Sequence, residues 1–341
     1  MLLPMESTLL PASGPRFHYA WVVFAASFIT LMGAAGFRSA ASVLQVPLHD
    51  EFGWSRGSVA LAVSINVLLY GFIGPFAAAW QRRFGLRRVT VWALVLMAAG
   101  AFGTTQMTHL WQLYLLWGVV VGAGSGCMAT VFAATVAARW FVAQRGLVTG
   151  VLTAASASGQ LIFVPILTRL ADGPGWRWVG LAVGLGSLGV VPVVVLFLRN
   201  SPADKGLLPY GGSPAAVIHE AKGNPIAAAL EAFDVARRSS TFWWLFASFA
   251  VCGLSTTGLI QTHFISAAHD HGMTGATAGG YLAFIGGFDV IGTIASGWLT
   301  DRWDPRKLLL VYYAFRGLSL FVLDCPSSSL ASRVCSRLEE E

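Results

Sequence analysis

The amino-acid sequence predicts an all-α protein that crosses a membrane several times. Of its 341 residues, 55% are hydrophobic and only 11% are charged, and the mean hydropathy is +0.66. A soluble domain carries roughly 25% charged residues, so this chain lacks the polar surface that a soluble globule of its size requires. The apolar residues lie in long continuous runs separated by short basic stretches, as in membrane-spanning helices. A soluble enzyme is therefore not expected.

Nine apolar segments are long enough, or nearly so, to cross about 30 Å of hydrocarbon as helices. They are residues 20–41, 59–80, 89–107, 111–137, 147–170, 176–198, 242–265, 278–299 and 308–323. Small residues recur inside them, for example Gly118, Gly122, Gly124 and Gly126. Because small residues let helices approach closely in lipid, we interpret most of these glycines as packing positions.

Lys and Arg lie almost entirely on one side of these predicted spans. With the N-terminus in the cytoplasm, 15 of the 22 Lys and Arg residues fall in inner loops and 3 in outer loops. Basic loops remain on the cytoplasmic side of a membrane. The sequence therefore predicts a multi-pass protein of the inner or plasma membrane with a cytoplasmic N-terminus. The same bias accounts for the net charge of +6, and no nucleic-acid partner is expected.

The longest stretch between spans is residues 199–241, which contains four prolines and several charges, as a cytoplasmic linker does. It divides the chain into a six-helix bundle at 1–198 and a partial bundle at 242–323, followed by a non-membrane tail at 324–341.

The loops after the second and the eighth span are similar in sequence. The first contains Arg83, Gly85, Arg87 and Arg88, and the second contains Gly297, Asp301, Arg302, Arg306 and Lys307. Arg83, Arg87 and Arg88 align with Arg302, Arg306 and Lys307 at a constant offset of 219 residues. A repeat of half a chain along the membrane normal is the layout of transporters that have two six-span halves.

These loops resemble those of the major facilitator superfamily, which read loosely Gly-x-x-x-Asp-Arg-x-Gly-Arg-Arg. The second copy fits this pattern well, whereas the first has Arg82 where the family usually has Asp. The stretch from Arg139 to Gly150, and Gly-Trp-Ser-Arg at 53–56, resemble the monocarboxylate-transporter-like branch, which includes oxalate/formate exchangers. The resemblance covers about residues 17–323.

The resemblance implies a fold of the major facilitator type, with a complete N-terminal six-helix bundle and a partial, three-helix C-terminal bundle. Family members have twelve spans, so a truncated or frameshifted reading frame is a hypothesis for this chain. The implied function is secondary transport of small organic anions, in particular monocarboxylates, coupled to a proton or a counter-anion. The implied protein is a monomer in the lipid bilayer without a cofactor, and its two basic loops act as conformational switches.

Apart from Arg169 and Arg177 at span ends, which count with the outer loops, three charged residues fall inside predicted spans. A charge there costs about 2.5–3.5 kcal/mol on insertion scales. Arg38 could bind a substrate anion bidentately, or its side chain could extend to the outer interface. Asp289 has no basic neighbour within one helical turn and could carry a proton, or it could form a structural ion pair with Arg316. Arg316 itself could pair with Asp289 or with an anion.

Polar residues in or beside the spans complete the predicted site. The candidates for substrate binding are Asn66, Tyr70, Gln160, Gln261 and His263, although packing between helices explains such residues equally well. His263 could also take part in proton coupling, because imidazole titrates near neutral pH. His269 and His271 fit a solvated loop better than a metal site.

The sequence does not support two other classes of function. No Walker A motif and no catalytic triad are found in the 341 residues, so neither ATP-driven transport nor an enzyme is supported. The alternative to a transporter is a non-transporting membrane protein, either a truncated pseudo-transporter or a sensor derived from a transporter.

Overall fold

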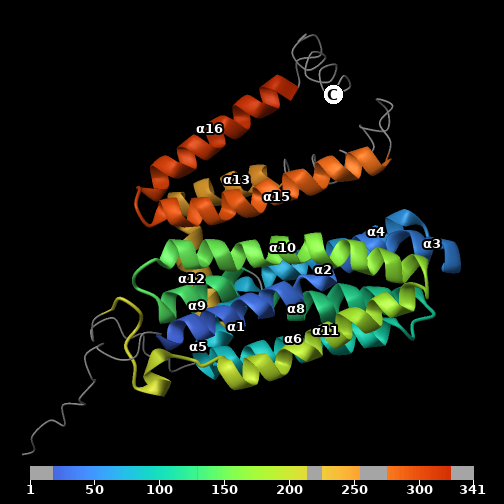
Figure 1. Ribbon diagram of the computed structural model, residues 1–341, viewed down its shortest axis with the longest axis horizontal. Helices are drawn as coiled ribbons and strands as arrows, with labels where there is room; N and C mark the ends of the chain where they lie inside the picture. Colours follow the sequence, from blue (N-terminus) through green and yellow to red (C-terminus); the bar gives the residue numbers. More distant parts are fainter. Residues whose placement is uncertain (1–17, 129, 213–224, 254–274, 324–341) are drawn as a thin grey trace, which may run out of the picture.

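In the computed structural model of the protein, residues 18–128, 130–212, 225–253 and 275–323 are described, and they are almost entirely helical. With the labels of Figure 1, the first seven helices and the π-helix η1 follow the chain as α1 (Tyr19–Ala34), α2 (Gly36–Val43), α3 (Gln45–Phe52), α4 (Arg56–Phe72), α5 (Gly74–Phe84), α6 (Leu86–Thr104), α7 (Leu110–Leu113) and η1 (Tyr114–Val121). They continue as α8 (Gly122–Cys127), α9 (Thr130–Trp140), α10 (Arg145–Asp172), α11 (Trp176–Phe197), the 3-10 turn η2 (Pro202–Lys205), α12 (Pro225–Arg237), α13 (Ser240–Gly253), α15 (Gly275–Thr300) and α16 (Pro305–Leu323).

Four helical stretches are each long and apolar enough to cross a bilayer, namely Leu86–Thr104, Leu110–Trp140, Arg145–Asp172 and Trp176–Phe197. A fifth is added if Gly57–Phe72 and Gly74–Phe84, which meet at 50°, form one span. The bend lies at Gly74 and Pro75, because proline lacks an N–H and its ring obstructs the preceding turn. These stretches coincide with the second to sixth predicted spans.

The remaining predicted spans correspond to other helices. The first is broken at Ala35 into α1 and α2, the eighth corresponds to α15 and the ninth to α16. The seventh begins with α13, and residues 254–265 lie outside the described part of the chain. Figure 1 shows α1, α6, α10 and α11 with their axes roughly aligned in a bundle, and α15 beside α10.

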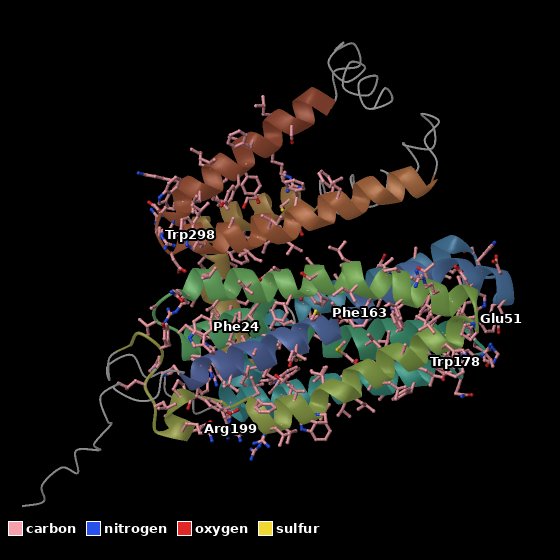
Figure 2. The ribbon with its side chains drawn as sticks, viewed as in Figure 1. Phe24, Glu51, Phe163, Trp178, Arg199 and Trp298 are labelled. Carbon is pink, nitrogen blue, oxygen red and sulfur yellow. The ribbon has the colours of Figure 1, made fainter. Side chains whose placement is uncertain are left out.

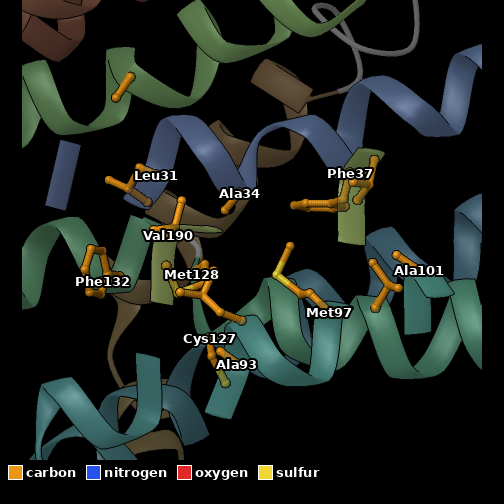
Figure 3. Packing of buried hydrophobic residues seen from close by; sticks show 14 of the residues in the cluster. Leu31, Ala34, Phe37, Ala93, Met97, Ala101, Cys127, Met128, Phe132 and Val190 are labelled. Carbon is orange, nitrogen blue, oxygen red and sulfur yellow. The ribbon is translucent and has the colours of Figure 1, made fainter. Parts of the chain in front are cut away.

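Glycines hold the helices of this bundle close together. A methyl group at Gly124 would lie 2.6 Å from Met97 Cγ and 2.8 Å from the Ala93 carbonyl oxygen, and one at Gly126 would lie 3.1 Å from the carbonyl oxygen of Leu69. Figure 3 shows Ala93 and Met97 in this contact region between α6 and α8. The packing role predicted for the glycines of the fourth span is confirmed.

The π-helix η1 is fixed to α4 by a buried amide. In a π-helix the backbone bonds run from i to i+5, which changes the partners that carbonyl groups can find inside the helix. Asn66 Nδ2 donates a 2.8 Å hydrogen bond to the Trp117 carbonyl oxygen, and only 6% of the Asn66 surface is exposed. A methyl group at Gly122, the first residue of α8, would lie 3.1 Å from Asn66 Cα. The backbones of α4 and α8 are therefore in contact.

The chain after α11 folds back onto the bundle. The Tyr210 N–H donates to the Trp140 carbonyl oxygen at 2.8 Å, and the Tyr210 carbonyl oxygen accepts from Val142 N at 2.9 Å. The Tyr210 ring also meets the rings of His18 and Trp21 edge to face, at 5.6 and 5.7 Å. The first part of the predicted linker is therefore an ordered part of the bundle, and its later part contains α12, which packs against α5 and α13.

A carboxylate joins α3 to the start of α11 at the other end of the bundle. Glu51 accepts hydrogen bonds from Trp176 Nε1 and, at 2.8 Å, from the Arg177 guanidinium. Figure 2 shows Glu51 at the opposite end of the bundle from Arg199. These two donors, Trp176 above all, hold the pKa of Glu51 below its ordinary value of 4.5.

We predict that the stabilising effect of Glu51 depends on pH. Because the folded state lowers the pKa of Glu51, its contribution is complete above pH 4.5 and is lost as the pH falls through the folded-state pKa. Glu51→Gln should therefore lower the thermal unfolding midpoint of the purified protein at pH 7, and the difference from wild type should shrink in acid. Asp50→Asn is the neighbouring control, and a Glu51→Gln deficit that is constant across pH would contradict this interpretation.

Candidate functional site

The middle of α10, at residues 159–163, contacts both the first bundle and α15 of the partial bundle. On one side, a methyl group at Gly159 would lie 2.5 Å from Ala35 Cβ, and one at Gly36 would lie 3.6 Å from the Phe163 ring. On the other side, Leu161 Cδ2 lies 2.9 Å from where a methyl group at Gly286 would stand. Figure 2 shows Phe163 where α10 faces α2. The junction of α1 and α2 and the middle of α15 therefore meet α10 at residues 159–163.

Three of the predicted site residues belong to this level. Gln160 lies within the contact segment of α10, and Arg38 lies two residues beyond Gly36 in α2. The side chains of Arg38 and Gln160 fall outside what the structure describes. Asp289 lies three residues beyond Gly286 in α15. The backbone thus brings these three positions to the same part of the bundle.

Asp289 lies beside the face of α15 that contacts α10. That face is set by Gly286 against Leu161 and by the Thr293 carbonyl oxygen, 2.8 Å from where a methyl group at Gly150 would stand. Asp289 follows the first of these positions by three residues and precedes the second by four, so it shares their side of the helix. Its side chain is exposed, and within the described residues no salt bridge involves it.

The suggested structural pair of Asp289 with Arg316 is not formed among the described residues. The Arg316 guanidinium instead donates to the Cys252 carbonyl oxygen at 3.1 Å and contacts the Cys252 thiol at 3.4 Å. Among the described residues, the Arg316 guanidinium thus joins α16 to α13.

The other predicted binding residues lie elsewhere. Asn66 bonds the π-helix, as described above, and Tyr70 is half-buried against the core of the first bundle. Gln261, His263, His269 and His271 lie outside the described residues. Within the described ranges, no group of three or more His, Cys, Asp or Glu side chains could hold a metal ion.

Asp301 connects the second predicted loop to the first bundle. Its Oδ1 accepts a hydrogen bond from the Gly146 N–H at 2.6 Å, and its Oδ2 accepts one from Leu147 N–H at 2.8 Å. These N–H groups belong to the first turn of α10, where no helical carbonyl is available to them. The residue before this helix, Gln144, has a left-handed backbone (φ 59°) and makes no capping bond with its own side chain. Asp301, the residue that follows α15, is thus the N-terminal cap of α10.

The same crossing depends on glycine. A methyl group at Gly297 would lie 2.5 Å from the Gly146 carbonyl oxygen and 2.9 Å from Gly150 Cα. Both neighbours are backbone atoms that cannot rotate away. The spacing of Gly146 and Gly150 on α10 is the small-xxx-small pattern of close helix pairs in membranes. Only glycine at these positions brings Asp301 within hydrogen-bonding distance of α10.

The first predicted loop is held within its own bundle. Gly85, the residue before α6, has φ 87°, and a methyl group there would lie 2.6 Å from the Asn200 amide. Asn200 Oδ1 accepts from the Arg87 N–H at 3.0 Å. The buried Arg139 donates to the Asn200 carbonyl oxygen at 3.1 Å and to the Gln81 carbonyl oxygen at 3.0 Å. Arg82, at the position of Asp301, is exposed.

The remaining basic residues of the two loops lie at the surface of one end of the molecule, which we call the basic end. The Arg83 guanidinium lies 5.9 Å from the Phe84 ring centre, and that of Arg302 lies 3.8 Å from the Trp298 ring centre. Arg88, Arg306 and Lys307 are exposed. The Arg306 N–H bonds to Asp304 Oδ1 at 2.9 Å, so Asp304 caps α16 within its own half.

Sequence reasoning missed Asn200, Gln81 and the role of Gly146 with Gly150. The pair of glycines was visible as a small-xxx-small motif inside the stretch from Arg139 to Gly150. Asn200 carried no such signal, because Arg139 and Arg87, its partners in the bundle, lie 61 and 113 residues away along the chain. Arg139 was counted as a loop residue, whereas the structure buries it in the last turn of α9.

The architecture and the paired loops can now be compared with known proteins. Residues 23–331 match the Major Facilitator Superfamily. The chain belongs to this family. The fold expected from the sequence, an all-α membrane protein of the major facilitator type, is thereby confirmed.

Relatives within the superfamily support the predicted branch. The chain is 28% identical over 324 residues to monocarboxylate transporter 11 of Mus musculus, covering 92% of this chain and 67% of the relative. It is 28% identical to the Homo sapiens protein of the same name, covering 63% of it. It is also 24% identical to the uncharacterized MFS-type transporter YcxA of Bacillus subtilis, covering 90% of this chain and 71% of the relative. The chain thus spans about two thirds of the length of these relatives.

A solved structure supports the fold. The proton:xylose symporter XylE bound to 6-bromo-6-deoxy-D-glucose superimposes with a TM-score of 0.60 at 13% identity. The match covers 84% of this chain and 70% of the symporter. At this identity the likeness concerns the helical architecture alone.

We predict that Gly297→Ala separates α10 from α15. The added methyl group meets backbone at 2.5 Å, and overpacking of this kind costs about 1–3 kcal/mol. The thermal unfolding midpoint of the purified protein should fall. Gly292→Ala, on the same helix with nothing within 4 Å, is the matched control. Equal midpoints for the two variants would contradict the close crossing.

Proposed function

We propose that this superfamily member is a secondary transporter of small organic anions, in particular monocarboxylates, which works by alternating access. The names of its curated relatives support the substrate class, and Arg38 would supply the positive charge that a carboxylate requires. The coupling partner is a proton or a counter-anion. The protein would act as a monomer in the inner or plasma membrane, with the basic end in the cytoplasm.

The observation that carries this proposal is the bond from Asp301 to the start of α10. Such a carboxylate satisfies two otherwise unbonded N–H groups and lies at the positive end of the helix dipole. It joins two bundles that alternating access must move relative to each other. In this conformation it holds the basic end closed, and opening that end must break it. The loop at 297–307 therefore works as a latch.

One helix connects this latch to the level of the predicted site. Asp289 and Asp301 are 12 residues apart, and α15 is continuous from Gly275 to Thr300, so they are separated by about 18 Å at 1.5 Å per residue. A tilt of α15 that follows protonation of Asp289 or anion binding near Arg38 would strain the Asp301 bonds. Asn66, Tyr70, Gln160, Gln261, His263 and Arg316 stay as predicted contributors to substrate binding, and His263 to proton coupling.

We predict that Asp289→Asn abolishes proton-coupled uptake and leaves exchange intact. Asparagine keeps the shape of the side chain but cannot release a proton. The measurement is carboxylate uptake into proteoliposomes with and without a pH gradient, beside counterflow with substrate on both sides. Gradient-driven uptake unchanged by the substitution would exclude Asp289 as the proton carrier. Wild-type protein without saturable uptake of any carboxylate would favour the alternative, a non-transporting membrane protein.

A second prediction concerns the latch. Asp301→Asn removes the negative charge from the cap of α10. A hydrogen bond to a charged group contributes about 1.5 kcal/mol, so its loss should change the opening equilibrium at the start of α10 roughly tenfold. Amide hydrogen exchange at the start of α10 should accelerate by about that factor. Asp304→Asn should leave α10 unchanged, since Asp304 caps α16 instead. Equal exchange in both variants would overturn the latch.

A further inference from the structure

Helix α12 carries an exposed apolar stripe at the basic end of the molecule. Ile226, Leu230 and Phe233 are spaced by four and three residues, which places them on one side of the helix. They are 49%, 56% and 54% exposed. On the adjoining side Ala229 is buried, and the helix packs against α5 and α13. We call Ile226, Leu230 and Phe233 the α12 stripe.

The position of α12 favours contact between the α12 stripe and a membrane surface. Figure 1 shows α12 behind the basic end of the bundle, across the direction of the long helices. The next helix, α13, carries Trp243 and Trp244 near its start, and these are 52% and 78% exposed. Trp243 Nε1 donates to the Arg237 carbonyl oxygen at 2.8 Å and so joins the two helices. Tryptophan is enriched at the boundary between lipid and water.

Positive charge surrounds the α12 stripe. Arg237 ends α12 and Arg238 follows it, and both pair with Asp234 while remaining 53% and 72% exposed. Arg82 and Arg83 lie exposed in the last turn of α5, the helix against which α12 packs. The only other acidic side chain of α12 is Glu231. The arginines therefore outnumber the carboxylates, and a site of this kind attracts anionic headgroups.

We propose that α12 is an in-plane membrane helix that binds anionic lipid. Its stripe lies at the boundary of headgroups and acyl chains, and the arginines of α12 and α5 contact the headgroup phosphates. An amphipathic helix with apolar residues on one side and basic residues beside them binds lipid surfaces in this way. The proposal requires the chain to lie in a bilayer and is independent of which substrate it carries.

The test is spin-label accessibility in vesicles. Nitroxides are placed singly at positions 230 and 233 of the full chain, with the native cysteines replaced by serine, and at position 231 as a control on the same helix. The vesicles contain phosphatidylcholine alone or with phosphatidylglycerol. We expect labels at 230 and 233 to be accessible to oxygen and protected from a water-soluble nickel chelate, and the label at 231 to show the reverse.

The lipid dependence separates the headgroup contact from burial. Phosphatidylglycerol should increase the depth of the labels at 230 and 233 in the bilayer. The double substitution Arg237→Gln with Arg238→Gln should reduce this increase at least severalfold. Stripe labels accessible to the nickel chelate would overturn the proposal, and so would labels shielded from both reagents, which would mean that protein covers the stripe. Equal depth in both lipids would overturn the anionic-lipid contact. None of these readouts requires transport, so failed uptake would not affect them.

Discussion

The start of α10 requires a hydrogen-bond acceptor that its own sequence does not provide. Gln144 enters the helix from a left-handed conformation without a capping side chain, and the N–H groups of Gly146 and Leu147 bond to Asp301. Buried or partly buried N–H groups without acceptors are costly. The two bundles are therefore joined by hydrogen bonds between backbone N–H groups and the Asp301 carboxylate. The glycines of α10 and α15 let the two helices approach closely enough for these bonds to form.

The two halves of the molecule use their related loops differently. Arg82 occupies the position of Asp301, and an arginine cannot cap a helix N-terminus, because its charge has the same sign as the helix dipole there. The first loop is instead fixed inside its own bundle through Asn200 and Arg139. The structure thus has one loop that crosses between the halves and one that stiffens a single half.

Much of the fold could be predicted from hydropathy and composition, because a lipid environment leaves helices as the main solution for satisfying the backbone. The predicted spans agree with the helices from α4 to α11, and the loop motif pointed to Asp301. The bond partner of Asp301 could not be predicted, because it lies 155 residues away and is a backbone N–H, which has no sequence signature. The docking of Tyr210 on Trp140 was missed for the same reason.

For the candidate site, sequence reasoning identified residue types but not their placement. Asp289 was recognised from its charge alone, and the structure adds that it lies beside the α10 contact face at the level of Gln160. Asn66 and Arg316 have the polarity of ligand-binding residues, yet their contacts are with the Trp117 and Cys252 carbonyl groups. Hydropathy cannot distinguish a polar side chain that satisfies a helix backbone from one that faces a substrate.

The central claim is that the Asp301 cap holds the basic end closed. The most direct measurement is the distance distribution between nitroxides at positions 88 and 303, one in each half and both exposed, by pulsed electron paramagnetic resonance in nanodiscs. In wild type a short-distance population should dominate, and Asp301→Asn should move the balance roughly tenfold toward a longer distance, whereas Asp304→Asn should not. A distribution unchanged by Asp301→Asn would contradict the account.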